Sequence, residues 1–190
     1  MTNPATPPSM SSPYDEALRR SADRTASLRR GAERIIGDWL DGEPLLRVSE
    51  PPGPPVRPGP APQAGPLSVL VAEDEYELSE LLAASLRADG ADVRTVPRVT
   101  TALAALAAPQ PVDVLVVDLD LVDGVGIEVV EHARARRPDV GVVVISGTVR
   151  ARLDEVGVKL GAVACLQKPF TTDQLVAAVR RAAPKRAVAP

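Results

Sequence analysis

One apolar stretch, residues 112–120 (VDVLVVDLD), constrains the fold of this chain more than any other feature. It follows a turn signal at Pro109 and Pro111, runs mainly through β-branched residues and ends in carboxylates. An apolar run of this length, bounded by turn residues, is typical of a strand that is buried on both faces, as in a parallel sheet. Ligands of open parallel sheets gather beyond the carboxyl ends of the strands, so Asp118 is predicted to lie at the mouth of such a site.

Strand and helix patterns alternate along the chain from Leu67 onward. The predicted strands are 67–72, 91–96, 112–120, 140–145 and 162–167, and the predicted helices include 100–107, 149–160 and a last helix from Thr171. Strands that alternate with helices at this spacing indicate right-handed β-α-β units on one parallel sheet. We therefore expect an α/β fold, specifically a flavodoxin-like, doubly wound, five-stranded parallel sheet.

The first 66 residues lack this pattern and divide into three segments. Residues 1–12 are rich in Pro, Ser and Thr and are predicted to be disordered, whereas recurrent prolines in residues 42–66 indicate an extended linker. Residues 13–41 are predicted to form one amphipathic helix with a heptad-like apolar seam. The seam consists of Tyr14, Leu18, Ser21, Thr25, Leu28, Ala32, Ile35 and Trp39. Two alternatives stay open: the helix docks on its own domain, or it pairs with a helix of a second copy or a partner.

Composition excludes several classes of function. A net charge of −3 provides no overall attraction to nucleic acid or anionic membranes, and an aromatic content of 2% argues against a base-stacking surface. A single cysteine, Cys165, and a single histidine exclude an intramolecular disulfide and a thiolate–imidazole zinc site. No stretch is long enough to span a bilayer and no signal-peptide pattern begins the chain, so a cytoplasmic location is expected.

Chemically useful side chains follow four of the five predicted strands. Glu73 and Asp74 follow the first strand, Asp118 lies on the third, Ser146 follows the fourth and Lys168 the fifth. Three crowded carboxylates repel one another, and a hard cation such as Mg²⁺ between them relieves that repulsion. A carboxylate that is flanked by a metal, an ammonium and a hydroxyl is equipped to accept a phosphoryl group.

These motifs resemble the receiver domain of two-component response regulators. The matching segments are 69–75 (VLVAEDE), 118–124 (DLDLVDG), 143–147 (VVISG) and 166–170 (LQKPF). The resemblance covers a domain of residues 67–183 and leaves the first 66 residues and the tail 184–190 unmatched.

The resemblance implies a role for each residue of the acceptor site. Asp118 would accept the phosphoryl group from a phosphohistidine, Lys168 would hold a phosphoryl oxygen, and Ser146 would hydrogen-bond the phosphoryl group and pull the following loop. The peptide before Pro169 would be cis. Cys165 stands where the family often has an aromatic switch residue, so switching by that side chain is in doubt.

The resemblance also implies a magnesium site. Asp74 and Asp118 would bind Mg²⁺ directly, Glu73 would bind it through water, and the backbone carbonyl of Asp120 would complete the protein ligands.

The expected function is that of a response-regulator receiver protein that signals through protein–protein contacts. Its phosphoryl donor would be a sensor histidine kinase or a histidine phosphotransfer protein, and its phosphorylation and dephosphorylation would be self-catalysed rather than enzymatic turnover. Only Pro184 to Pro190 follow the last predicted helix, so no C-terminal effector domain is expected. Two alternatives are a haloacid-dehalogenase-like aspartyl-phosphate phosphatase and a degenerate receiver that only binds partners. In the phosphatase family the paired acids follow the lysine, whereas Glu73 and Asp74 precede Asp118 here.

Overall fold

The computed structural model describes residue 16 and residues 29–42, 65–148 and 150–184. Five parallel strands form one sheet in the order β2-β1-β3-β6-β7, and two short antiparallel strands, β4 and β5, pair beside it. The sheet strands are β1 (Ser68–Ala72), β2 (Asp92–Val96), β3 (Val114–Asp118), β6 (Gly141–Ser146) and β7 (Ala164–Gln167). The helices of the domain are α3 (Tyr76–Ala88), α4 (Val99–Ala107), α5 (Gly126–Arg136), α6 (Arg150–Leu160) and α7 (Thr172–Ala182). This arrangement confirms the predicted doubly wound, five-stranded sheet.

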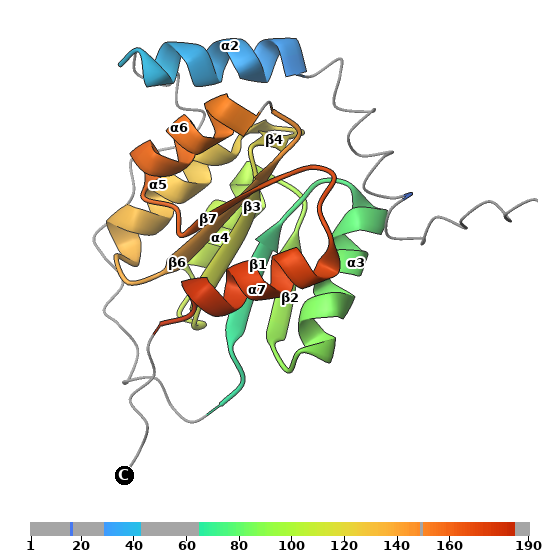
Figure 1. The fold of residues 1–190 in the computed structure, drawn as a ribbon. Coiled ribbons are helices and arrows are strands. Elements are labelled where there is room, and N and C mark those ends of the chain that lie inside the picture. Colours follow the sequence, from blue (N-terminus) through green and yellow to red (C-terminus); the bar gives the residue numbers. More distant parts are fainter. Residues whose placement is uncertain (1–15, 17–28, 43–64, 149, 185–190) are drawn as a thin grey trace, which may run out of the picture.

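Helices cover both faces of the sheet, with α3 and α7 on one face and α4, α5 and α6 on the other (Figure 1). Along β3, Val114 and Val116 pack with the first group of helices, whereas Leu115 and Val117 pack with the second. All five residues of β3 are buried, as the apolar run predicted. With both faces covered, the polar residues of the central strands gather at the ends of the strands.

The third predicted strand was too long at both ends. Asp113 lies just before β3, and its side-chain carboxylate accepts a hydrogen bond from the backbone amide of Ser68 at 2.8 Å. Asp120 leaves the sheet and pairs with Val125 across β4 (Asp120–Leu121) and β5 (Gly124–Val125). The segment from Asp120 to Val125 therefore forms a small hairpin that leads directly into α5.

A further helix, α2 (Arg29–Leu40), is the described part of the predicted helix 13–41, and Glu16 is also helical. It lies along α6 (Figure 1), where Ile36 is fully buried and Trp39 is 7% exposed. The predicted seam omitted Ile36, which is buried more completely than the seam residue Ile35, although Ile35 also packs against the domain. For this half of the helix, the structure shows docking on the chain's own domain. The predicted disordered segment 1–12, most of the linker 42–66 and the tail after Pro184 lie outside the described residues.

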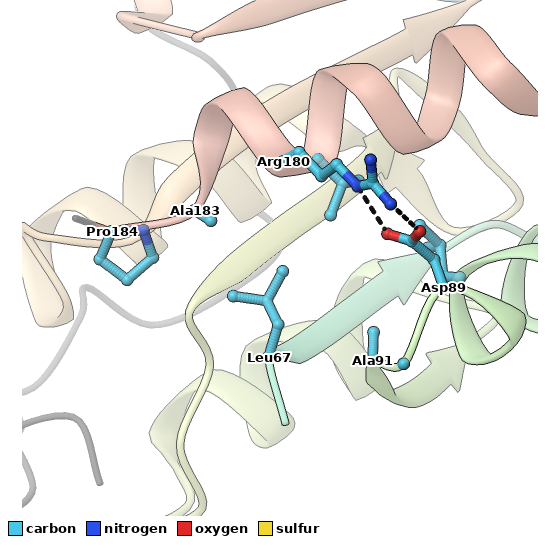
Figure 2. Close-up of a pocket in the computed structure, with 9 residues that line it drawn as sticks. Leu67, Asp89, Ala91, Arg180, Ala183 and Pro184 are labelled. Atoms are coloured by element: carbon cyan, nitrogen blue, oxygen red, sulfur yellow. Dashed lines mark hydrogen bonds and ion pairs between the residues drawn. The ribbon is translucent and has the colours of Figure 1, made fainter. Parts of the chain in front are cut away.

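A cavity of about 320 Å³ lies at the edge of the sheet opposite to the carboxyl ends of the strands. Leu67, Asp89, Ala91, Arg180 and Pro184 are among its lining residues (Figure 2). The carboxylate of Asp89 and the guanidinium of Arg180 form an ion pair across its rim. The cavity is therefore separate from the predicted phosphoacceptor. No helix in the described part of the chain combines the length and the apolar character that a membrane crossing requires.

Candidate phosphoacceptor and metal site

The carboxyl ends of β1, β3, β6 and β7 meet at one edge of the sheet, because all four strands run parallel. Asp118 is the last residue of β3 and is 2% exposed. The other predicted site residues lie at this edge: Glu73 and Asp74 directly after β1, Ser146 at the end of β6 and Lys168 directly after β7.

Lys168 connects two of the acids. Its Nζ donates to Asp118 Oδ2 at 2.5 Å and to Glu73 Oε2 at 2.9 Å, and the lysine is 4% exposed. Burial by itself lowers the pKa of Lys168, but the charges of Asp118 and Glu73 outweigh it and raise that pKa above its usual value. The ammonium is therefore charged at neutral pH and fixed beside Asp118. The Lys168–Pro169 peptide is cis.

Glu73, Asp74 and Asp118 form an acidic cluster whose ligand oxygens all lie within 4.8 Å of one another. Burial raises the pKa of Glu73 to about 8, and the charge of Asp118 contributes to the rise, while Lys168 opposes it. The single positive charge of Lys168 cannot neutralise the negative charges of three ionised carboxylates that lie this close together. The cluster thus has the composition and the excess negative charge that suit a divalent cation with oxygen ligands.

The loop after β3 contacts the carboxylate of Asp118 through a backbone amide. The backbone amide of Asp120 donates to Asp118 Oδ1 at 3.1 Å, and Asp120 is itself 5% exposed. The chain then returns so closely that a Cβ at Gly126 would lie 2.0 Å from the backbone oxygen of Asp118. Only glycine fits at this position, which explains why the glycine-rich segment follows the acceptor.

Ser146 lies at the same edge, but its hydroxyl bonds to a neighbour. Ser146 Oγ accepts the backbone amide of Thr148 and donates to Thr148 Oγ1, both at 3.1 Å, and both side chains are buried. The backbone oxygen of Ser146 accepts the amide of Lys168 at 2.8 Å, which ties this loop to the lysine. Thr148 was not among the predicted site residues, although a serine hydroxyl often hydrogen-bonds the backbone two residues further along the chain.

Cys165 lies on β7, half-buried, beneath α6. A Cβ at Gly157 of α6 would lie 2.2 Å from Cys165 Sγ, so the helix approaches the strand closely at this point. Gly157 has no side chain, which allows this contact. Cys165 packs against the apolar cluster of α4, α5 and α6 as a partly buried side chain.

These features define the class of protein. A parallel five-stranded sheet carries a buried aspartate at the carboxyl end of its central strand, with a lysine and two further acids around it. The family model of the response regulator receiver domain matches residues 69–180, and the chain belongs to this family. The match decides against the haloacid-dehalogenase alternative, as does the order of the acids along the chain.

Known proteins resemble the chain over this same domain. A putative NtrX-like response regulator of Rickettsia felis is 33% identical over 120 residues, which are 61% of this chain and 25% of that protein. The acid tolerance regulatory protein ActR of Rhizobium meliloti is 34% identical over 112 residues, or 59% of this chain and 57% of that protein. The chain therefore spans about a quarter to just over half of the length of these two relatives.

A solved structure shows the same architecture. A response regulator from Burkholderia pseudomallei, crystallised with a phosphorylated aspartic acid, calcium ion and citrate, superimposes with a TM-score of 0.54 at 27% identity. The superposition covers 59% of this chain and 65% of the other.

Proposed function

We propose that Asp118 accepts a phosphoryl group from a phosphohistidine on a sensor histidine kinase or a histidine phosphotransfer protein. One observation carries this proposal: a buried carboxylate is held 2.5 Å from the ammonium of Lys168, within a cluster of two further acids. Transfer of a phosphoryl group depends mainly on positioning and on neutralising charge, and this cluster supplies both.

The residues of the site divide the chemistry between them. An oxygen of Asp118 attacks the phosphorus as the bond to the histidine nitrogen breaks, and the electron pair of that bond returns to the imidazole. Lys168, whose ammonium binds Asp118 and Glu73, would hold a phosphoryl oxygen. Ser146 offers its hydroxyl to the phosphoryl group once it turns away from Thr148.

We assign a magnesium ion to the acidic cluster. Asp74 and Asp118 would bind it directly, Glu73 through a water molecule, and the backbone carbonyl of Asp120 would add a fourth protein contribution. When bound, the ion neutralises charge on the transferring oxygens. The crowding of Glu73, Asp74 and Asp118 and the raised pKa of Glu73 support this assignment.

The protein in this proposal turns over no separate substrate. It catalyses its own phosphorylation and dephosphorylation and passes the signal on through contacts with a protein target. The balanced charge and the low aromatic content argue against nucleic acid as that target. We place the protein in the cytoplasm, and we propose that two copies would pair through the N-terminal helix predicted over residues 13–41.

Phosphorylation by a small donor tests the function directly. The full chain, incubated with acetyl phosphate and Mg²⁺, should gain one phosphoryl group, which intact-mass measurement and a phosphate-affinity gel both detect. Asp118→Asn should gain none, because its amide cannot act as the nucleophile.

A matched control is Asp139→Asn, which changes an exposed acid before β6 and should leave phosphorylation unchanged. Failure of the wild-type protein to gain a phosphoryl group from acetyl phosphate or from a phosphohistidine donor would contradict the proposal and would leave a degenerate, binding-only receiver.

A further inference from the structure

The contact between α2 and the receiver domain is specific rather than loose. Ile36 is fully buried, and Trp39 lies in the same apolar cluster as Leu153 and Val156 of α6. Trp39 Nε1 donates to Glu131 Oε1 of α5 at 3.1 Å. Both the apolar and the polar parts of the tryptophan therefore have partners on the domain.

Lys159 of α6 binds the carboxyl end of α2. Its Nζ donates to the backbone oxygens of Trp39 and Leu40, the latter at 3.2 Å, and lies 4.2 Å from the centre of the Trp39 ring. A cation at the carboxyl end of a helix is favourable because the last carbonyls there lack helical partners. The close approach of α2 is visible at Gly37, where a Cβ would lie 2.6 Å from a guanidinium nitrogen of Arg152.

The helix that receives α2 is the one that follows the Ser146 loop. Thr148 binds Ser146 through its amide and its hydroxyl, and α6 begins at Arg150, two residues later. A phosphoryl oxygen on Asp118 that accepts a hydrogen bond from Ser146 Oγ takes the one proton that this hydroxyl donates to Thr148 Oγ1, so that bond must break. That change reaches α6 within two residues, and α6 carries Lys159, Leu153 and Val156, which contact α2 or share its apolar cluster.

We propose that α2 is a built-in regulatory helix whose docking on α5 and α6 opposes phosphorylation of Asp118. The docked helix occurs together with an arrangement of the site in which Lys168 binds Asp118 and Ser146 binds Thr148. A ligand that binds better to another arrangement of the Ser146 loop reduces the affinity of α2 for the domain. By linkage, the docked α2 reduces the affinity of the protein for that ligand by the same factor. The inference rests on the proposed function of Asp118.

Trp39 makes this coupling measurable in the unmodified protein, because it is the single tryptophan of the chain. Beryllofluoride with Mg²⁺ serves as the phosphoryl mimic. Its binding to the full chain should shift the emission of Trp39 to longer wavelength, because the indole loses its buried position against α6. Asp118→Asn should show no shift under the same conditions.

The reciprocal measurement uses variants of the docked helix. Ile36→Ala removes a fully buried side chain from the contact, and Lys159→Ala removes the lysine that binds the end of α2. Each variant should bind beryllofluoride at least about fivefold more tightly than the wild-type protein. Asp38→Ala changes an exposed residue of the same helix and should leave the affinity unchanged.

Fluorine NMR of bound beryllofluoride separates the two ways in which these experiments can fail. Bound mimic without a change in Trp39 emission, or equal or weaker binding by both helix variants, would overturn the regulatory role of α2 and leave the phosphoacceptor intact. Absence of bound mimic in the wild-type protein would remove the proposed function and this inference together.

Discussion

At the scale of single residues, Asp123 shows how a side chain outside the acidic cluster supports the acceptor loop. Its carboxylate accepts the backbone amides of Val99 and Thr100 at 2.6 and 3.1 Å, and the hydroxyl of Thr100 at 2.9 Å. Asp123 thereby caps the first turn of α4 from a segment more than twenty residues away, and it ties the loop after Asp118 to that helix.

Asp123→Ala should destabilise the protein by about 1 kcal/mol, the usual cost of losing a helix cap, as measured by urea unfolding. Burial alone would raise the pKa of Asp123, but the hydrogen bonds from Thr100 and Val99 outweigh it and lower that pKa below 3.8. The stabilisation by Asp123 is therefore complete above the pKa of this group in the unfolded chain. It is lost as the pH falls through the lower pKa of the folded protein. The difference between the wild-type protein and Asp123→Ala should shrink in acid. A difference that grows below pH 3.8 would contradict this account.

At the scale of elements, α2 shows that the predicted heptad seam described too narrow an apolar face. A strict seam places one apolar residue every three or four positions, which suits a single partner helix. The structure instead packs Ile35, Ile36, Trp39 and Leu40 against the domain, a wider face that contacts both α5 and α6. A helix that lies on two neighbours needs the broader apolar stripe of a globular domain.

The start of α7 is encoded locally and offers a test at this scale. Thr171 Oγ1 accepts the amide of Gln174 at 3.2 Å, while Gln174 Oε1 accepts the amide of Thr171 at 2.8 Å, which forms a capping box. Thr171→Ala should lower the free energy of unfolding by about 1 kcal/mol. Thr172→Ala is the matched control, because it changes the next residue and leaves the box intact. Equal losses in the two variants would show that the cap contributes nothing of its own.

At the scale of the whole molecule, the acidic cluster links metal binding to stability. Glu73 and Asp118 follow strands that are far apart in the chain, and folding places their charges together in a buried site. A cation that binds only this folded arrangement stabilises the whole domain by mass action.

Mg²⁺ at a hundred times its dissociation constant should therefore raise the free energy of unfolding by about 2.7 kcal/mol, and thermal unfolding would show this as a higher Tm. Asp74→Asn should lose most of this gain, because it removes a direct ligand. Asp92→Asn, an exposed change at the start of β2, should retain it. An increase in Tm that is the same in all three proteins would indicate nonspecific binding of the ion.

Much of this protein is determined by local sequence. The buried run of β3, the alternation of strands and helices and the capping box at Thr171 each depend on neighbours in the chain. Parallel strands bring their carboxyl ends to one edge of the sheet. The strand pattern was therefore sufficient to predict that one edge carries Glu73, Asp74, Asp118, Ser146 and Lys168.

Only the tertiary structure decided which of these groups touch. Lys168 Nζ lies between Glu73 and Asp118, and Lys159 reaches the end of α2 across 120 residues of sequence. Such contacts join side chains that have no local signal for one another. They depend on how whole helices and strands pack, because a shift of about 1 Å in any element separates a donor from its acceptor.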